Sequence, residues 1–551
     1  MSDQAMMNLQ WCDALLCGLE AAGVSDVVIS PGSRNTPLIL AADRRAALRC
    51  HVQIDERCAA FYALGIARAQ HRPVALICTS GSAPGNWHPA VIEADTGGTP
   101  LILLSADRPW ELQNNGANQS IDQIKLFGGS VRGFHALPPA EATPQSTNQL
   151  MQLGVQAVHQ SLWPDPGPVH INVPLREPLV PAEPLPEAAL FSGQPAPSRM
   201  PELCATEQQL LAIAHQISGQ PGVIVCGGGI DSTEFNRQVT ALATICGAPI
   251  FADPLSGLRF GEHDLSHVVV DYDTRLRDAK LTADLQPHWI LRFGAMPVSK
   301  QLQQFLQQSS AAQHILVDPT GRWQDPLHHT SEMMRAAPGS FCRLLRQQEL
   351  AAVPAQWLYA FVVPDSRGID SAEEAPLEQT IVQDLISGLP DGSILFSGNS
   401  LPIRYLDSYS GKRSKPLQVV ANRGASGIDG NVSTLLGMAV ESEKQDVTVA
   451  ALIGDLTLYH DMNGLLAAKD LNAVIVVLNN HGGGIFKQLP QSQLPQFDRY
   501  WRTDTEIDLQ KVADLYALEY FRVEQGADFS GVLQKALHHE GVVLIEVMMN
   551  A

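Results

Sequence analysis

Short apolar runs alternate with helical patterns along the whole chain. The runs fall into three groups: 26–30, 73–80, 100–106 and 168–174; 222–228, 248–254, 288–294 and 314–319; and 393–398, 417–422, 447–455, 473–480 and 542–548. Nearly continuous apolar strands separated by helices indicate parallel sheets that helices cover on both faces. The pattern therefore predicts an α/β protein with three such sheets.

Two segments without a regular pattern separate the groups. Residues 174–201 contain eight prolines, a density that prevents regular structure and favours an extended crossover along the surface. The second segment, at about 351–376, ends in the polar stretch 364–376 and precedes a helical pattern that starts at Leu377. The expected domains are 1–180, 200–350 and 375–551.

The charge balance and the cysteines narrow the class of protein. The 551 residues include 37 Lys and Arg against 57 Asp and Glu, a formal net charge of −20. A chain this acidic is a poor general binder of nucleic acid or anionic membranes, although local basic pockets are compatible with it. Nine cysteines without a CxxC pair disfavour a disulfide framework or a zinc site and fit a reducing compartment.

The first apolar segment does not resemble a signal peptide or a membrane anchor. It runs from Trp11 to Val24, is interrupted by Asp13 and Glu20, and predicts an amphipathic helix. No stretch of the sequence approaches the roughly 20 apolar residues of a membrane span. We therefore expect a soluble, cytoplasmic protein without membrane insertion or nucleic-acid partners.

Polar residues follow two neighbouring predicted strands of the last group. Asp455 ends one strand and Asn480 the next, and the helical pattern between them makes one βαβ unit, so both should emerge at adjacent strand tips. A carboxylate, an amide oxygen and a loop carbonyl suit Mg²⁺ with a diphosphate, and the glycines at 482–484 permit close approach to phosphates. Singly, these residues would suit a helix cap and a turn; their paired placement favours the metal site.

The spacing of these two motifs resembles that of the thiamine-diphosphate (ThDP) enzymes of the pyruvate-oxidase-like and transketolase-like classes. In that family the Asp, the second Asn and the carbonyl two residues later bind Mg²⁺, or in some cases Mn²⁺. The resemblance implies Asp455, Asn480 and Gly482 as ligands, although Leu456 stands where the family often has Gly. It also implies a pyruvate-oxidase-like fold with pyrimidine-binding (PYR), central and diphosphate-binding (PP) domains in this order.

An acidic residue near the pyrimidine ring of the cofactor is the second requirement. In the family a Glu after the second strand of the PYR domain hydrogen-bonds ring nitrogen N1′ and promotes loss of the cofactor's C2 proton. The stretch 51–57 supplies Glu56, followed by an apolar helical pattern as in the family. The neighbouring Asp55 and Arg57 would equally suit a solvated charge cluster, but the position favours Glu56.

The remaining strand-end loops carry a more specific pattern. They are SPGSRNTPL (30–38), TSGSAPGN (79–86), SADRPWEL (105–112), GANQSI (116–121), SGNSLPIR (397–404) and NRGASGIDG (422–430). Together they closely resemble the 2-succinyl-5-enolpyruvyl-6-hydroxy-3-cyclohexene-1-carboxylate (SEPHCHC) synthases of menaquinone biosynthesis, over nearly the full chain. The resemblance implies decarboxylation of 2-oxoglutarate and 1,4-addition of the succinyl carbanion to isochorismate, with release of CO₂.

The resemblance also implies a role for individual residues. Both substrates are polyanions, and a planar guanidinium pairs with the two oxygens of a carboxylate. Ser400 and Arg404 are expected to hold the succinyl carboxylate. The residues expected around isochorismate and the reaction intermediate are Ser33, Arg34, Arg108, Asn118, Lys300, Gln119 and Arg423. The residues expected at the cofactor are Glu56, Ser82 and Ile428, where Ile428 wedges between the two rings.

Two features mark the middle domain. The stretch CGGGID (226–231) follows a strand but lacks the full G-x-G-x-x-G pattern, so we expect a structural loop without flavin or dinucleotide. Gln301 follows Lys300 where relatives often carry Arg, which removes one positive charge.

The quaternary structure and two alternatives complete the interpretation. In the family the PYR domain of one subunit faces the PP domain of another, so the resemblance implies a dimer or a dimer of dimers. One alternative is another ThDP-dependent decarboxylase or carboligase, such as an acetolactate synthase; the arginines of the loops argue against it. The other is a catalytically inactive ThDP-fold binding protein; Glu56, Asp455 and Asn480 argue against that.

Overall fold

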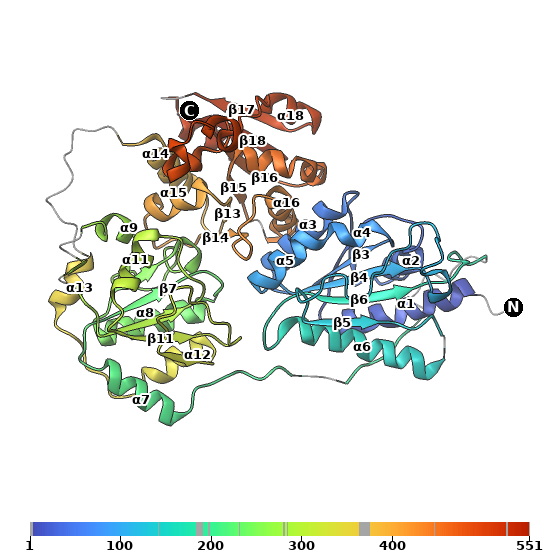
Figure 1. Ribbon diagram of the computed structural model, residues 1–551, viewed down its shortest axis with the longest axis horizontal. Coiled ribbons are helices and arrows are strands. Elements are labelled where there is room, and N and C mark those ends of the chain that lie inside the picture. The colour runs from blue at the N-terminus through green and yellow to red at the C-terminus, as the bar shows by residue number, and fades with distance from the viewer. Residues whose placement is uncertain are drawn as a thin grey trace.

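Three six-stranded sheets form the framework of the protein in the computed structural model shown in Figure 1. The structure describes residues 4–141, 143–182, 191–196, 199–230, 232–278, 282–283, 285–362, 375–445, 447–524 and 527–549. Every strand pairing within the three sheets is parallel. Helices flank each sheet, so the predicted fold class is confirmed.

The first and third sheets share one topology. The first has the order β2-β1-β3-β4-β6-β5 and the third the order β14-β13-β15-β16-β18-β17. The strands of the first are β1 (Asp26–Ile29), β2 (Arg49–Val52), β3 (Val74–Cys78), β4 (Leu101–Asp107), β5 (Gly133–Ala136) and β6 (Val169–Pro174). Those of the third are β13 (Ile394–Ser397), β14 (Gln418–Ala421), β15 (Val449–Gly454), β16 (Ala473–Asn479), β17 (Glu519–Val523) and β18 (Val542–Met548).

The middle sheet is wound differently, in the order β12-β11-β10-β7-β8-β9. Its strands are β7 (Gly222–Cys226), β8 (Ile250–Ala252), β9 (Val268–Val269), β10 (Trp289–Phe293), β11 (Gln313–Val317) and β12 (Glu332–Met334). With β7 as the first strand, this is the doubly wound 3-2-1-4-5-6 order. Each of the three sheets lies inside one of the three expected domain ranges.

The helices that matter for the site come from all three domains. In the first domain they are α1 (Gln4–Ala21), α3 (Glu56–Gln70), α4 (Ser82–Asn86), α5 (His88–Gly97) and α6 (Pro144–Leu162). In the middle domain they are α7 (Glu207–Ile217), α11 (Lys300–Gln308) and α13 (Ala355–Val362). In the third domain they are α14 (Leu377–Gly388), α15 (Leu401–Tyr409), α16 (Asn431–Gln445) and α17 (Asp455–His460).

Central strands were predicted from the sequence far better than edge strands. Every central strand coincides with a predicted apolar run, because parallel strands covered on both faces are continuously apolar. Four edge strands, β5, β9, β12 and β17, were missed, and β2 was inferred only through the family resemblance. These strands are short or partly exposed: β2 alternates between half-buried and exposed positions, which blunts the apolar signal.

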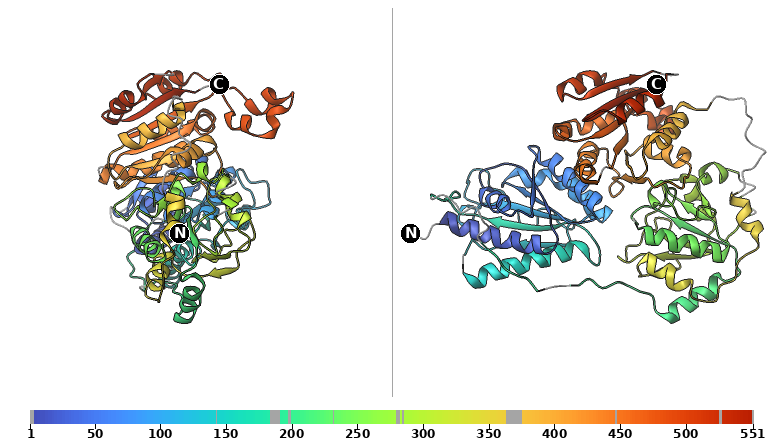
Figure 2. Two further views of the ribbon diagram at one scale, coloured as in Figure 1. Left: turned by 90° about the vertical axis from the view of Figure 1, so that its left-hand side faces the viewer. Right: turned by 180° about the vertical axis from the view of Figure 1, so that it is seen from behind.

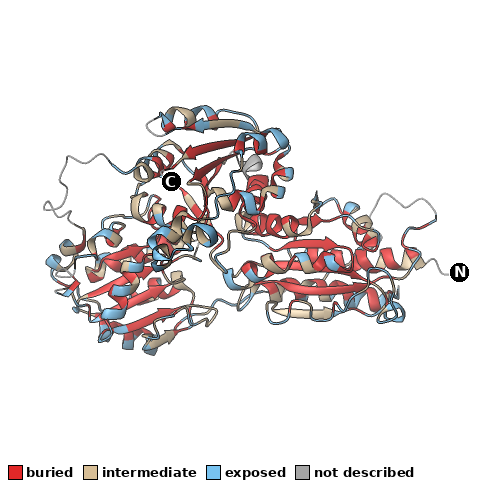
Figure 3. Ribbon diagram, turned by 45° about the horizontal axis from the view of Figure 1, so that its top comes forward, coloured by how far each residue is buried: buried red, intermediate tan, exposed pale blue. Residues whose placement is uncertain are grey.

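The first and third domains pack against each other through α3 and α16, which lie side by side (Figure 1). A Cβ at Gly65 of α3 would lie 2.0 Å from the carbonyl oxygen of Thr434, and a Cβ at Gly437 of α16 would lie 2.1 Å from that of Tyr62. Only glycines allow this approach. One hydrophobic core runs through both domains, and Figure 3 shows buried residues following the sheets and these two helices.

The N-terminal helix differs from the prediction. The stretch from Trp11 belongs to α1, which is buried nearly all round from Leu9 to Leu19 rather than amphipathic. The two acidic residues that suggested a polar face are ion-paired with Arg45, Asp13 at 2.6 Å and Glu20 at 2.5 Å. Pairing allows the carboxylate of Asp13 to be buried between α1 and the rest of the domain.

The two expected linkers are only partly irregular. The described parts of 175–201 contain neither helix nor strand, and they lie between the first and the middle domain (Figure 1). In the second expected linker, α13 forms a helix whose Phe361 belongs to the core of the middle sheet. The polar stretch 364–376 lies outside the described residues except for 375–376, and the predicted helix from Leu377 is present as α14.

Candidate functional site

A cavity of about 730 Å³ lies at the carboxyl ends of β13, β15 and β16 in the third domain. These three strands are neighbours in the sheet, so the loops that follow them lie close together. Seven of the residues that were predicted for the site from the sequence line the cavity: Ser400, Arg404, Arg423, Ile428, Asp455, Asn480 and Gly482. Leu456, which stands where the family often has Gly, also lines it. They come from α15, the loop after β14, and the ends of β15 and β16.

The three expected metal ligands meet at one end of this cavity. Asp455 accepts hydrogen bonds from the backbone N–H of Gly482 at 2.8 Å and of Leu456 at 2.9 Å. Burial raises the pKa of Asp455, although these bonds oppose the shift. The amide oxygen of Asn480 is buried and has no hydrogen-bond partner. A half-buried carboxylate and an unsatisfied amide oxygen in the lining of one cavity fit a hard cation, and an orphaned buried acceptor is otherwise unfavourable.

Glycine is required in the loop that joins these ligands. Gly482 has φ of +117°, and a Cβ there would lie 2.0 Å from the carbonyl oxygen of Arg502. The preceding His481 has φ of 58°, an uncommon value for a residue with a side chain. The N–H of His481 donates to Asn479, which in turn donates to the buried carboxylate of Glu546 at 2.5 Å. The loop is therefore held in one conformation by β18.

Two guanidinium groups, those of Arg404 and Arg423, also line the cavity. Arg404 donates to the carbonyl oxygen of Ser400 at 2.6 Å, within its own helix, and Arg423 donates to Asn399 at 2.8 Å. Burial lowers the pKa of both arginines, and the nearby Arg404 lowers that of Arg423 further. Both stay charged at neutral pH, so the part of the cavity that they line is positive and suits a carboxylate.

Ser400 precedes α15 in a strained conformation. Its φ is 71° and its ψ is −125°, and its side chain does not cap the helix. Uncommon backbone angles in residues other than glycine concentrate at functional sites. The other end of α15 is tied to the middle domain: the fully buried Arg259 donates to Asp407 at 2.7 Å and to the carbonyl of the same residue at 2.8 Å. Burial raises the pKa of Asp407 to about 6, against the effect of Arg259.

A second cluster gathers the predicted residues of the first domain. Ser80, at the end of β3, accepts a hydrogen bond from Arg108 and donates one to the carbonyl of Gln119 at 3.1 Å. The side chain of Gln119 returns a bond to the carbonyl of Ser80 at 3.1 Å. Burial and then the nearby Arg34 lower the pKa of Arg108. Arg34 is buried, donates to the carbonyl of Leu175 at 2.9 Å and pairs with Glu177 at 2.8 Å.

The remaining predicted residues of the first and middle domains are more dispersed. Glu56 begins α3, is half-buried and accepts a hydrogen bond from Asn86 at 3.3 Å. Ser33, Ser82 and Asn118 are exposed on loops or at the start of α4. Lys300 is exposed at the start of α11 in the middle domain. The residues that line the third-domain cavity include none of these five.

The glycine-rich stretch of the middle domain has a packing role. A Cβ at Gly227 would lie 1.7 Å from the carbonyl oxygen of Ala295, so the backbones of two loops touch there. Asp231, the end of the stretch, lies outside the described residues. Among the described His, Cys, Asp and Glu residues, none form groups of three that could hold a metal, and the nine cysteines are free.

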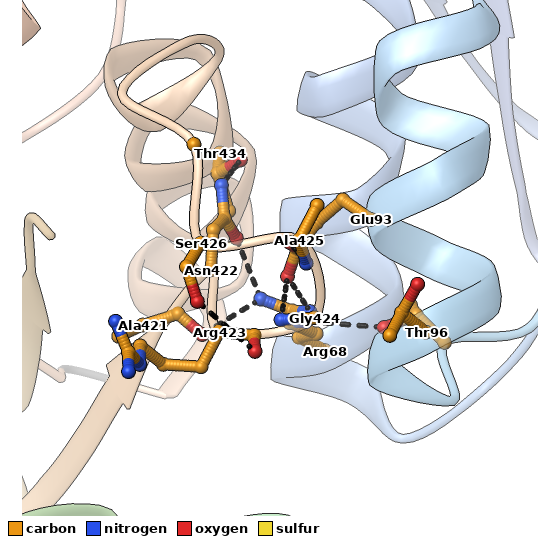
Figure 4. Close-up of polar contacts among 12 residues, drawn as sticks. Arg68, Glu93, Thr96, Ala421, Asn422, Arg423, Gly424, Ala425, Ser426 and Thr434 are labelled. Atoms are coloured by element: carbon orange, nitrogen blue, oxygen red, sulfur yellow. Dashed lines mark hydrogen bonds and ion pairs between the residues drawn. The ribbon is translucent and has the colours of Figure 1, made fainter. Parts of the chain in front are cut away.

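Three neighbours of the site were not predicted as site residues from the sequence, although Asn399 lies inside the SGNSLPIR stretch. Asn399 donates to the carbonyls of Asn422 and Gly427 and so ties the loop after β13 to the loop after β14. Glu93 and Arg68, both of the first domain, bind the loop after β14 from the other side (Figure 4). Glu93 and Arg68 lie inside ordinary helical patterns; only the arginine–glutamate pairing across helices, visible in three dimensions, singles them out.

Family models match all three domains. Residues 10–126 match the thiamine pyrophosphate enzyme N-terminal TPP binding domain, 202–396 the middle domain of thiamine pyrophosphate enzymes, and 406–547 the C-terminal TPP binding domain. Solved structures agree on the fold. Benzoylformate decarboxylase from Polynucleobacter necessarius superposes with a TM-score of 0.73 at 16% identity, covering 98% of each chain. The fold and the site thus define a thiamine-diphosphate-dependent enzyme.

Curated relatives narrow the class. The chain is 44% identical to the SEPHCHC synthase of Dechloromonas aromatica (strain RCB), over 99% of both chains, and 40% identical to that of Bacillus velezensis, over 96% of this chain and 92% of the relative. The chain belongs to the SEPHCHC synthase family. None of the described helices has the length and apolarity that crossing a membrane requires.

Proposed function

We propose that the protein decarboxylates 2-oxoglutarate and adds the resulting succinyl group to isochorismate in a 1,4-addition, giving SEPHCHC and CO₂ for menaquinone biosynthesis. The observation that carries the proposal is the cavity itself, whose lining combines Asp455, Asn480 and Gly482 with the guanidiniums of Arg404 and Arg423. Membership of the SEPHCHC synthase family supports the same reaction. The nine free cysteines suit a cytoplasmic enzyme.

Asp455, Asn480 and the carbonyl of Gly482 are proposed to hold Mg²⁺, or Mn²⁺ in its place, and through it the diphosphate of the cofactor. The orphaned amide oxygen of Asn480 supports this assignment, because a cation would satisfy it. A cation would also favour the charged form of the buried Asp455. The glycines at 482–484 leave room for phosphate oxygens near the backbone.

Thiamine diphosphate supplies, when bound, the electron sink that decarboxylation of a 2-oxo acid requires. Glu56 is proposed to hold a proton at the pyrimidine nitrogen N1′, and Ser82 to lie on the cofactor side. Ile428, half-buried on the wall of the cavity, is proposed to wedge between the two rings of the cofactor. Apolar wall residues such as Leu401 and Leu456 help to exclude water from the reacting groups.

The guanidiniums are proposed to sort the two polyanionic substrates. Ser400 and Arg404 hold the distal carboxylate of 2-oxoglutarate, since Ser400 directly precedes α15, Arg404 lies on it, and both line the cavity. Arg423 orients the reacting groups together with Gln119. The residues proposed for isochorismate are Ser33, Arg34, Arg108, Asn118 and Lys300. The shift that Arg34 imposes on Arg108 supports a shared anion pocket, because an anionic ligand relieves repulsion between two cations.

A dimer is proposed to complete each site. The walls of the cavity come from the third domain, whereas Glu56 and the Arg108 cluster lie on the first, so a second chain can bring the missing half. Exposed apolar residues support this: Val52 and Ile54 beside Glu56 are 65% and 67% exposed. The segment after the cation site, which includes Leu494 and Tyr500, extends away from the third domain (Figure 2, left) and is also partly apolar. Two dimers could associate further into a tetramer.

Mass spectrometry of the product tests the reaction. The protein is incubated with 2-oxoglutarate, isochorismate, thiamine diphosphate and Mg²⁺, and SEPHCHC and CO₂ are expected together. The matched control replaces 2-oxoglutarate by pyruvate and omits isochorismate. Acetolactate from pyruvate alone would assign the protein to another branch of the ThDP enzymes, and absence of any product with bound cofactor would indicate an inactive binding protein.

A further inference from the structure

The loop after β14 carries two of the proposed active-site residues, Arg423 and Ile428. The two residues that follow Arg423 form hydrogen bonds with the first domain. Gly424 N–H donates to one carboxylate oxygen of Glu93 at 2.9 Å, and Ala425 N–H donates to the other at 2.7 Å. Glu93 lies in α5 of the first domain and is only 2% exposed. A single buried carboxylate thus binds the two amides that follow Arg423 directly.

Arg68 of α3 holds the same loop from its beginning. Its guanidinium donates to Glu93 at 2.8 Å, to the carbonyl of Ala421 at 3.0 Å and to the side chain of Asn422 at 2.6 Å. Figure 4 shows Arg68 and Glu93 reaching the loop from the helices of the first domain. The ion pair therefore contacts the residues immediately before and after Arg423.

The contact leaves no space for the loop to move toward the first domain. A Cβ at Gly424 would lie 2.5 Å from the carbonyl oxygen of Glu93 and 2.7 Å from the nitrogen of Gly97. On its other side Arg423 is bonded to Asn399 of its own domain. Charge-assisted bonds to backbone amides are short and directional. They therefore restrict the orientation of the neighbouring side chains on the same loop.

We propose that Glu93 and Arg68 are positioning residues for the reaction: they fix the loop that presents Arg423 and Ile428 to the cavity. The inference rests on the proposed function of those two residues. It gives the first domain two tasks. Glu56 of the first domain contributes to the site that is completed by another chain. Arg68 of α3 and Glu93 of α5 instead set the geometry of the cavity in their own chain.

Glu93→Gln tests the proposal with little change in size. The amide has one acceptor oxygen where the carboxylate has two, and its N–H₂ group cannot accept a hydrogen bond from a backbone N–H. The loop therefore loses one of its two hydrogen bonds to residue 93. We expect kcat to fall by roughly ten- to a hundredfold, as for small misplacements of a catalytic group. The KM for 2-oxoglutarate should change by less than about threefold, because Ser400 and Arg404 lie at the start of α15 and within it, and not on this loop. Gly424→Ala displaces the loop without changing any charge and should show the same split.

Asp95→Asn is the matched control. Asp95 lies in the same helix and pairs with Arg132 at 2.5 Å, but its side chain bonds no residue of the loop. It should retain the wild-type kcat. Arg423→Ala separates the two hypotheses: wild-type activity in this variant would refute the proposed role of Arg423 and leave the contact with Glu93 intact.

Hydrogen exchange gives a readout that needs neither cofactor nor turnover. In the cofactor-free full-length protein, the amides of Gly424 and Ala425 should exchange slowly, and Glu93→Gln should accelerate them. Unchanged exchange, or accelerated exchange with wild-type kcat, would overturn the proposal. The double variant Arg68→Met/Glu93→Gln removes the unpaired charge and should recover thermal stability without kcat; recovery of both would reduce the pair to a structural role.

Discussion

The third-domain cavity and the first-domain cluster are built on sheets of the same order but behave differently. In the third domain, loops from neighbouring strands converge on one cavity within a single chain. In the first domain, the equivalent loops carry Arg108, Ser80 and Gln119, which bond mainly to one another. One topology thus builds a cavity in one copy and a cluster of mutually bonded side chains in the other.

The charges show the same difference. Within the described part of the chain, Arg404 and Arg423 of the third domain bond only neutral oxygens, so their charge stays available to an anion. Arg34 of the first domain is already paired with Glu177. The guanidiniums of the third domain therefore need not give up a carboxylate partner to bind an anion, whereas Arg34 of the first domain must exchange one. The predictions below test this division, from the largest expected effect to the smallest.

Asp455→Ala should abolish cofactor binding by the third domain. Without the carboxylate the proposed cation site loses its one charged ligand, so Mg²⁺-dependent binding of thiamine diphosphate should weaken by more than about a hundredfold. The thermal unfolding temperature should stay near that of the wild type, since desolvation, which raises the pKa of Asp455, disfavours its charged form in the folded protein. Titration calorimetry measures the affinity; an unchanged affinity would rule out this cation site.

Glu56→Gln should impair the first-domain half while cofactor still binds. The amide cannot hold the proton at N1′ as a carboxylate does, so exchange of the cofactor's C2 proton should slow by roughly 10²- to 10⁴-fold. NMR of the C2 proton after acid quenching measures the rate. A wild-type rate would mean that another group activates the cofactor.

Mixing these two inactive variants tests whether each site spans two chains. After dissociation and random reassociation, half of the dimers are mixed, and each mixed dimer has one site with both halves intact. We expect roughly a quarter of the wild-type activity to return. If each site formed within one chain, every site in the mixture would carry a defect, and no activity would return.

The comparison also shows what sequence could and could not predict. Central strands were predicted because burial on both faces makes them continuously apolar; edge strands such as β5 and β17 were missed because exposure breaks the run. Residues at strand ends were found through local spacing, as with Asp455 and Asn480. Glu93 was missed because its partners lie 331 and 332 positions away, and no local pattern reports such a contact.

Arg404→Ala and Arg108→Ala should separate the two substrates. The first should raise the KM for 2-oxoglutarate and slow CO₂ release in the absence of isochorismate; the second should leave that release nearly intact and block product formation. Loss of a charged hydrogen bond in a partly desolvated site costs about 1.5–3 kcal/mol, or roughly ten- to more than a hundredfold. CO₂ release from 2-oxoglutarate alone, followed by addition of isochorismate, distinguishes them. Equal damage to both steps in both variants would mean one shared electrostatic cluster in place of two pockets.

The smallest effect concerns the internal partner of Arg34. Glu177 is 71% exposed in its side chain, so its ion pair with Arg34 at 2.8 Å is worth about 0–1 kcal/mol. Glu177→Gln should nevertheless help an anion, because it removes a competing carboxylate from a guanidinium whose Nε is buried without a partner. We expect the KM for isochorismate to fall by up to about fivefold at low salt, and the gain to shrink as salt screens the exposed charge. The KM for 2-oxoglutarate should not change, since Arg404, the residue proposed to bind this substrate, lies in the third domain and not beside Glu177. Glu177→Asp, which keeps the charge, is the matched control. An equal fall for both substrates would indicate a general gain in positive potential, and Arg34 would then lose its assignment to isochorismate.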